Sequence, residues 1–158
     1  MQKTIRIADI KANDIIDGEG VCVSIWFQGC PHRCKGCHNP ETWNYEGGTL
    51  YGQDMLVFEI LKLIEKNGIQ RNLSLLGGEP LCPENIEFVE YLTKVVRHVY
   101  PDIKIYCWTG YELEQINLKY LKYIDVLIDG KFEIDKRDVT LKLRGSSNQR
   151  IINIQEYL

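Results

Sequence analysis

The pattern of apolar and polar positions predicts strands and helices that alternate along the chain. Four short apolar runs have the length and composition of strands buried in a parallel sheet: residues 21–27 ("VCVSIWF"), 73–76 ("LSLL"), 103–108 ("IKIYCW") and 124–128 ("IDVLI"). Apolar residues recur at helical spacing over 56–64, between the first two runs, and over 86–99, between the second and third. A shorter helix is predicted over 112–123.

Alternating strands and helices imply right-handed crossovers and a parallel sheet, so the predicted fold class is α/β. Residues 5–10 ("IRIADI") are predicted to add an edge strand at the start of the sheet, and residues 150–154 another at its end. The sequence shows no low-complexity linker, internal repeat or shift in composition. We therefore expect a single domain over residues 1–158.

Composition limits the classes of function. The chain is 44% hydrophobic and 26% charged, with a net charge of -3, so it lacks the basic footprint of proteins that bind nucleic acid or anionic membranes. Its first residues do not resemble a signal peptide, and no apolar run approaches the roughly 20 residues that span a bilayer. We expect a cytoplasmic protein, and a reducing compartment favours metal-binding or catalytic roles for clustered thiols.

The six cysteines fall into two groups. Cys30, Cys34 and Cys37 form a C-x3-C-x2-C cluster in "QGCPHRCKGCHN". Zinc would need a fourth ligand, which His32 or His38 could supply. An iron-sulfur cubane held by only three thiolates keeps one iron free for an outside ligand. The remaining cysteines are isolated and are predicted to be small buried apolar residues: Cys22, Cys82 and Cys107.

Polar or glycine-rich segments follow every predicted strand, which places them on one rim of a parallel sheet, where ligands bind. After the cysteine cluster these are Gly77-Gly78-Glu79-Pro80 ("GGEP"), Thr109-Gly110 and Asp129-Gly130-Lys131. Glycines let the backbone approach a ligand closely, and Glu79 could accept hydrogen bonds from a ligand ammonium group. The alternative for "GGEP" alone is a plain turn from strand to helix.

Two motifs carry a resemblance to a known family. "CPHRCKGC" is similar to the cysteine signature of radical S-adenosylmethionine enzymes, and "GGEP" to the motif by which they bind the methionine amino group. More narrowly, the chain resembles the activating proteins of anaerobic ribonucleoside-triphosphate reductase over nearly its whole length. The matching stretches are "GCPHRCKGCHNPETWN" from Gly29, "LSLLGGEPLCPEN" from Leu73, "WTGYELEQI" from Trp108, "VLIDGKF" from Val126 and "LRGSSNQR" from Leu143.

The resemblance implies a cofactor set and site residues. Cys30, Cys34 and Cys37 would hold a 4Fe-4S cluster whose fourth iron binds S-adenosylmethionine. Other expected contacts to this cofactor are backbone groups of Gly36, Cys37 and His38 at the adenine, Gly77, Gly78 and Glu79 at the methionine end, and Thr109 and Asp129 at the ribose or carboxylate. The chain departs from the wider superfamily at Gly36, where an aromatic residue is usual, although glycine is common in this subfamily. It departs from related activases at Glu19, where they tend to have proline.

The implied reaction is reductive cleavage of S-adenosylmethionine to a 5′-deoxyadenosyl radical, which takes a hydrogen atom from a glycine of the large reductase subunit. The expected partners are that reductase and a reduced flavodoxin-type electron donor. A complete eight-stranded barrel needs roughly 250 residues, so 158 residues imply a partial (β/α) barrel of mostly parallel strands with an open side.

Three other functions remain open at this stage. An electron-transfer protein would want four thiolates, whereas the cluster offers three. A zinc-stabilised binding module would use a histidine as its fourth ligand. An activase of a different glycyl-radical enzyme, such as a formate lyase, would share the cluster but is not expected to contain the "RGSSNQR" segment.

Overall fold

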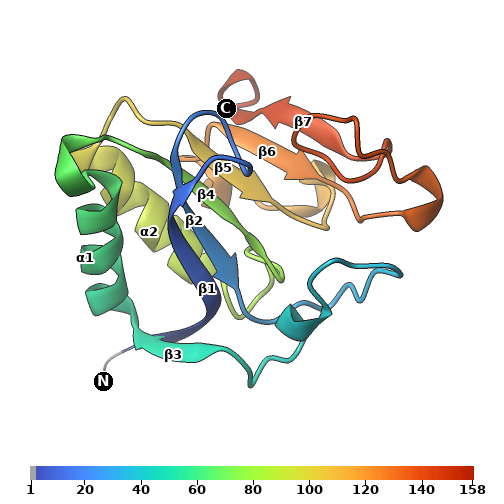
Figure 1. Cartoon of the computed structure of the whole chain (residues 1–158), viewed down its shortest axis with the longest axis horizontal. Helices are drawn as coiled ribbons and strands as arrows, with labels where there is room; N and C mark the ends of the chain where they lie inside the picture. The colour runs from blue at the N-terminus through green and yellow to red at the C-terminus, as the bar shows by residue number, and fades with distance from the viewer. Residues whose placement is uncertain (1–2) are drawn as a thin grey trace.

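The four predicted apolar runs form the centre of a seven-stranded sheet in the computed structural model, which describes residues 3–158 (Figure 1). The strands are β1 (Thr4–Asp14), β2 (Cys22–Phe27), β3 (Thr49–Gly52), β4 (Asn72–Gly77), β5 (Ile105–Trp108), β6 (Val126–Asp129) and β7 (Arg150–Asn153), in the order β3-β1-β2-β4-β5-β6-β7. The neighbours β2, β4, β5 and β6 are parallel, and the three outer pairings are antiparallel. The fold is therefore mixed α/β with a partly parallel sheet.

One prediction about an edge strand and one about a helix need correction. Strand β1 is not an edge strand, because the unpredicted strand β3 pairs with its outer side, where Ile7 lies opposite Thr49. The segment 112–123 forms two 3-10 turns, Leu113–Gln115 and Leu118–Leu121, in place of one helix. The side chain of Asn117 accepts a hydrogen bond from the backbone N–H of Lys119, which starts a new turn and interrupts helical continuation. Strand β7 is an edge strand, as predicted.

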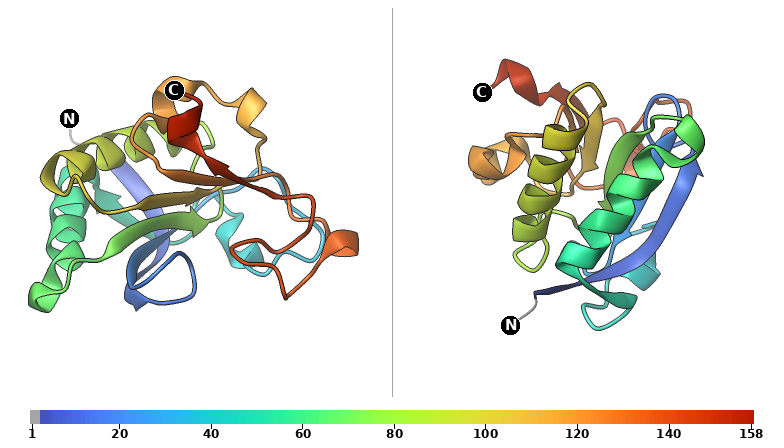
Figure 2. Two further views of the ribbon diagram at one scale, coloured as in Figure 1. Left: turned by 90° about the horizontal axis from the view of Figure 1, so that it is seen from above. Right: turned by 90° about the vertical axis from the view of Figure 1, so that its left-hand side faces the viewer.

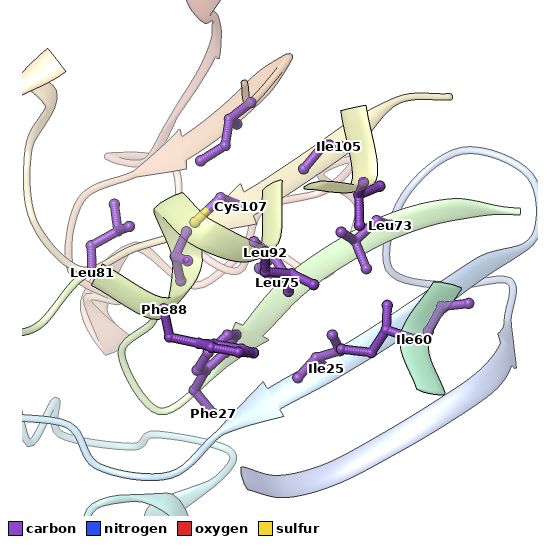
Figure 3. Packing of buried hydrophobic residues seen from close by; sticks show 14 of the residues in the cluster. Ile25, Phe27, Ile60, Leu73, Leu75, Leu81, Phe88, Leu92, Ile105 and Cys107 are labelled. Atoms are coloured by element: carbon purple, nitrogen blue, oxygen red, sulfur yellow. The ribbon is translucent and has the colours of Figure 1, made fainter. Parts of the chain in front are cut away.

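Two helices, α1 (Gln53–Ile64) and α2 (Ile86–Val99), pack side by side on one face of the sheet (Figure 2). Alternate residues of the central strands face them, and Figure 3 shows the side chains of Ile25, Phe27 and Leu75 packed toward Ile60 and Phe88. All five of these side chains are buried, so this layer holds the main hydrophobic core. None of the helices within residues 3–158 is long and apolar enough to span a membrane.

The opposite face of the sheet is covered by the loop between β1 and β2. Ser24, Ser74 and Tyr106 lie side by side across this face and are all buried. The hydroxyl of Ser74 donates to the carbonyl of Asp17, 2.5 Å away. A Cβ at Gly18 would lie 2.8 Å from Sγ of Cys22 and 2.9 Å from Oγ of Ser74, so only glycine fits there. Both faces of the central strands are therefore covered.

Two acidic residues hold this loop. Oδ1 of Asp14, a buried residue at the end of β1, accepts hydrogen bonds from the backbone N–H groups of Ile16 at 2.9 Å and Asp17 at 3.3 Å. Burial acts to raise the pKa of Asp14, but its hydrogen bonds outweigh burial and lower that pKa. Burial, together with the neighbouring Asp14 carboxyl, raises the pKa of Asp17 to about 7.

The pH dependence of stability tests this carboxyl pair. Between about pH 4 and pH 7 the folded state holds a proton on Asp17 that the unfolded chain releases, so this group's contribution to stability falls as pH rises through that range. We expect the free energy of unfolding of the metal-free protein to fall less between about pH 5 and pH 8 in Asp17→Asn than in the unsubstituted protein. Denaturant titration at each pH measures this.

The matched control is Asp135→Asn, because Asp135 is exposed. That variant should keep the pH dependence of the unsubstituted protein. Parallel curves for Asp17→Asn and the unsubstituted protein would contradict the assignment of this proton to Asp17.

Candidate functional site

The loop after β2 is held in a defined shape by hydrogen bonds to the segment that follows it. The Gln28 side-chain amide donates to the carbonyl oxygens of Glu41 at 2.9 Å and Asn44 at 2.7 Å. The backbone N–H of Gly29 donates to the carbonyl of Thr42 at 2.7 Å. The chain therefore folds back on itself, and the three clustered cysteines lie between these anchored ends.

The three cysteines lie around one cavity. Cys30 is buried, Cys34 and Cys37 are half-buried, and all three line a cavity of about 140 Å³. Left-handed backbone at Arg33 (φ 50°) and Gly36 (φ 78°) turns the loop so that its cysteines face this space. Burial raises the pKa of Cys30 to about 11, and burial also raises the pKa of Cys34. These thiols keep their protons at neutral pH until a metal displaces them.

Gly77 and Gly78 bring the turn after β4 against the backbone of the cysteine loop. A Cβ at Gly77 would lie 2.6 Å from the backbone N of Phe27, and one at Gly78 would lie 2.5 Å from the carbonyl oxygen of Gly29. Gly77 also has a φ of 107°, which other residues rarely adopt. Both glycines line the same cavity as the cysteines, as the sequence led us to expect.

Glu79 lies directly behind this cavity and is completely buried. One carboxylate oxygen, Oε1, lies 2.6 Å from Nε2 of His32 and accepts the backbone N–H of Gly110 at 2.7 Å. The other, Oε2, accepts the hydroxyl of Thr109 at 2.7 Å and the backbone N–H of Leu81 at 2.9 Å. Within residues 3–158, its side chain therefore contacts protein groups and does not line the cavity.

Thr109 and Asp129 occupy different places on the rim. Thr109 lines the cysteine cavity, whereas Asp129 lines an adjoining cavity of about 540 Å³ that shares Gly110 and Gly130 with it. The buried Asp129 carboxylate accepts hydrogen bonds from Nε of Arg150 at 2.9 Å and from the backbone N–H of Leu113 at 2.8 Å. Its oxygens therefore cap a turn and hold strand β7, the alternative role for a strand-end aspartate.

Gly36 and His38 lie at the far end of the cysteine loop, against the segment after β6. A Cβ at Gly36 would lie 2.3 Å from Cδ1 of Ile134. The ring of His38 packs at 5.5 Å from that of Phe132. Both residues are exposed and neither lines the cavity, so the structure brings them near the site but not into it.

Five further residues of the cavity wall were not predicted from the sequence: Thr42, Trp43, Trp108, Phe132 and Gln149. Gln149 belongs to the "RGSSNQR" segment, whose role the sequence left undefined. Its Oε1 accepts the backbone N–H groups of Gly145 at 2.9 Å and Ser146 at 3.1 Å, and its Nε2 donates to the carbonyl of Gly130 at 2.9 Å. The segment therefore closes the side of the site next to β6. The sequence did not reveal this role because the segment lies far along the chain from the clustered cysteines.

The donor set distinguishes between the metals considered. Within the described part of the chain, no three His, Cys, Asp or Glu side chains are placed to hold a single metal ion. His32 is bound to Glu79 and His38 packs on Phe132, so neither completes a zinc site here. Three thiols spread around one cavity fit an iron-sulfur cubane, because each thiolate binds a different iron and the sulfurs need not converge on one point.

The three isolated cysteines lie away from this donor set. Cys22 lies in β2, Cys107 lies in β5, and Cys82 precedes α2. All three are buried, as expected for small apolar residues.

Comparisons with known proteins support an iron-sulfur cluster over a zinc ion. A family model described as a 4Fe-4S single cluster domain matches residues 16–152. The chain is 44% identical over 140 residues to a protein of Enterobacteria phage T4, covering 87% of each chain. It is 40% identical over 150 residues to one of Pasteurella multocida (91% of this chain, 94% of the relative) and 35% over 145 residues to one of Escherichia coli K12 (90% and 94%). All three relatives are named anaerobic ribonucleoside-triphosphate reductase-activating protein, and the chain belongs to this family.

Proposed function

We propose that this protein activates anaerobic ribonucleoside-triphosphate reductase as a radical S-adenosylmethionine oxidoreductase. The observation that carries the proposal is the single cavity that the Cys30, Cys34 and Cys37 thiols share with the Gly77-Gly78 turn. The names of the relatives support the same target. We also propose that residues 1–158 form one domain and that the sheet acts as a partial barrel, open between β3 and β7, in the cytoplasm.

The proposed cofactors are a 4Fe-4S cluster and S-adenosylmethionine. Three thiolates on four irons leave one iron for the amino and carboxylate groups of S-adenosylmethionine. The residues proposed to contact this molecule are Gly36, Cys37 and His38 at the adenine, Gly77, Gly78 and, through its backbone, Glu79 at the methionine end, and Thr109 and Asp129 at the ribose or carboxylate. The cysteine cavity of about 140 Å³ is small for such a ligand, so the adjoining cavity of about 540 Å³ would hold the remainder.

When bound, the cluster would supply one electron that cleaves S-adenosylmethionine, and the 5′-deoxyadenosyl radical released would take a hydrogen atom from a glycine of the reductase. The chain's own residues suit hydrogen-atom transfer, which needs positioning and dryness but no general base. The described residues that line the cysteine cavity include no Asp, Glu, Lys or Arg, and its one histidine is bound to Glu79. Trp43, Trp108 and Phe132 give it aromatic walls.

Partners follow from this chemistry. A glycine of another protein must reach the cavity, and the proposed owner of that glycine is the large reductase subunit. The proposed electron source is a reduced flavodoxin-type protein, and we propose no nucleic-acid or membrane partner.

Cleavage of S-adenosylmethionine tests the reaction. After anaerobic reconstitution with iron and sulfide and reduction with S-adenosylmethionine present, we expect the protein to form 5′-deoxyadenosine, measured by liquid chromatography. Cys34→Ala removes one of the three cluster ligands and should leave only the protein-free background. Cys22→Ala, in a buried residue of strand β2 away from the cavity, is the matched control and should keep the activity. Equal yields from Cys34→Ala and the unsubstituted protein would refute the proposal.

The target is tested separately. The reconstituted protein is mixed with anaerobic ribonucleoside-triphosphate reductase, or with a formate lyase, and examined by electron paramagnetic resonance. We expect the doublet of a glycyl radical with the reductase alone. A doublet with the formate lyase and none with the reductase would move the protein to a different activase class.

A further inference from the structure

The Glu79 carboxylate connects three loops that the sequence keeps far apart. His32 belongs to the loop after β2, Leu81 to the turn after β4, and Thr109 and Gly110 to the loop after β5. All four donate to, or contact, the two oxygens of one fully buried side chain at 2.6–2.9 Å. These are the same loops whose residues line the cysteine cavity.

His32 links the cysteine loop to the Glu79 carboxylate. It stands between Cys30 and Cys34 in the chain, and its side chain is only 6% exposed. The ring packs edge-on against Tyr111, with 4.6 Å between ring centroids. Glycine at position 110 leaves space for the His32 ring, because a Cβ there would lie 2.4 Å from Cδ2 of His32. Contacts from two other elements, the Glu79 carboxylate after β4 and the Gly110–Tyr111 segment after β5, therefore hold this histidine in one orientation.

The hydrogen-bond donors around Glu79 indicate which member of the His32–Glu79 pair carries the hydrogen between them. Each Glu79 oxygen faces a backbone N–H that can only donate, from Gly110 on one side and from Leu81 on the other. An amide side chain in its place would point its own N–H₂ group at one of these hydrogens. A carboxylate satisfies both, and we assign the hydrogen in the contact with His32 to Nε2 of the ring.

We propose that His32 and Glu79 are positioning residues, which lock the cysteine loop to the Gly77-Gly78 turn so that one S-adenosylmethionine molecule can contact the cluster and the turn together. This inference rests on the proposed function. It gives the Glu79 side chain a role behind the cavity, while the backbone of the same turn faces the ligand. A direct contact between the Glu79 carboxylate and the ligand ammonium is the competing role, and it predicts a different response to changes at His32.

The test compares substitutions of His32 in the reconstituted protein. His32→Leu removes the hydrogen bond, His32→Asn keeps a polar amide that is too short to reach Glu79, and His32→Gln restores a donor near the position of Nε2. His98→Leu is the matched control, because His98 is exposed on α2. For each protein we measure iron and sulfide content, and the S-adenosylmethionine concentration that half-saturates the change in the electron paramagnetic resonance spectrum of the reduced cluster.

We expect all variants to keep their iron, because the three cysteines are intact. His32→Leu and His32→Asn should raise the half-saturating concentration by about tenfold or more, the effect of losing one hydrogen bond to a buried charge. His32→Gln should recover most of this loss, and His98→Leu should behave as the unsubstituted protein. If His32→Leu loses its iron, the comparison of His32→Asn with His32→Gln decides, since equal half-saturation in those two variants overturns the proposal.

Two further outcomes separate this inference from the proposed function. A half-saturating concentration unchanged or lowered in His32→Leu would assign the Glu79 carboxylate to direct ligand contact and overturn the inference alone. A spectrum of the unsubstituted protein that does not respond to S-adenosylmethionine would overturn the proposed function, and this inference with it.

Discussion

The site depends on the close approach of two backbone segments, the loop that follows β2 and the turn that follows β4. Their parallel pairing continues to Phe27 opposite Gly77, and it is extended by hydrogen bonds from Gly78 N–H to Phe27 at 2.9 Å and from Glu79 N–H to Gly29 at 2.8 Å. A side chain at Gly78 would meet a carbonyl oxygen that cannot rotate away. The paired glycines are therefore required by the contact between two loops, whatever ligand they also face.

The chemistry of the cavity follows from how its charges are arranged. The acidic groups of the rim are bound to protein partners: Glu79 to His32 and to three hydrogen-bond donors, and Asp129 to Arg150. What faces the space is mainly thiols, glycine backbone and aromatic rings, with the uncharged polar side chains of Thr42, Thr109 and Gln149 and the ring of His32. Such a surface suits a cofactor that carries its own charge and reactivity, with the protein supplying position and dryness.

The four central strands were predicted correctly because their burial is nearly complete. The strands β2, β4, β5 and β6 are covered on both faces, so their apolar runs are almost continuous and visible in the sequence. Strand β3 has only four residues, exposed or half-buried, and exists because β1 offers an edge to pair with. The predicted helix over 112–123 was wrong because a local side-chain hydrogen bond at Asn117 starts a new turn, a competition that apolar spacing does not record.

The sequence by itself determined the three clustered cysteines, the glycine pair of "GGEP" and the common rim on which they meet, because these depend on residue type and on the direction of parallel strands. It did not determine where the carboxylates point. Only the tertiary structure turned Glu79 toward His32 and Thr109, directed Asp129 to Arg150, and brought Gln149 to the cavity wall. The physical reason is that a buried polar side chain takes whichever donors packing brings within reach, and for Glu79 those donors lie 30 residues away in Thr109 and 47 residues away in His32.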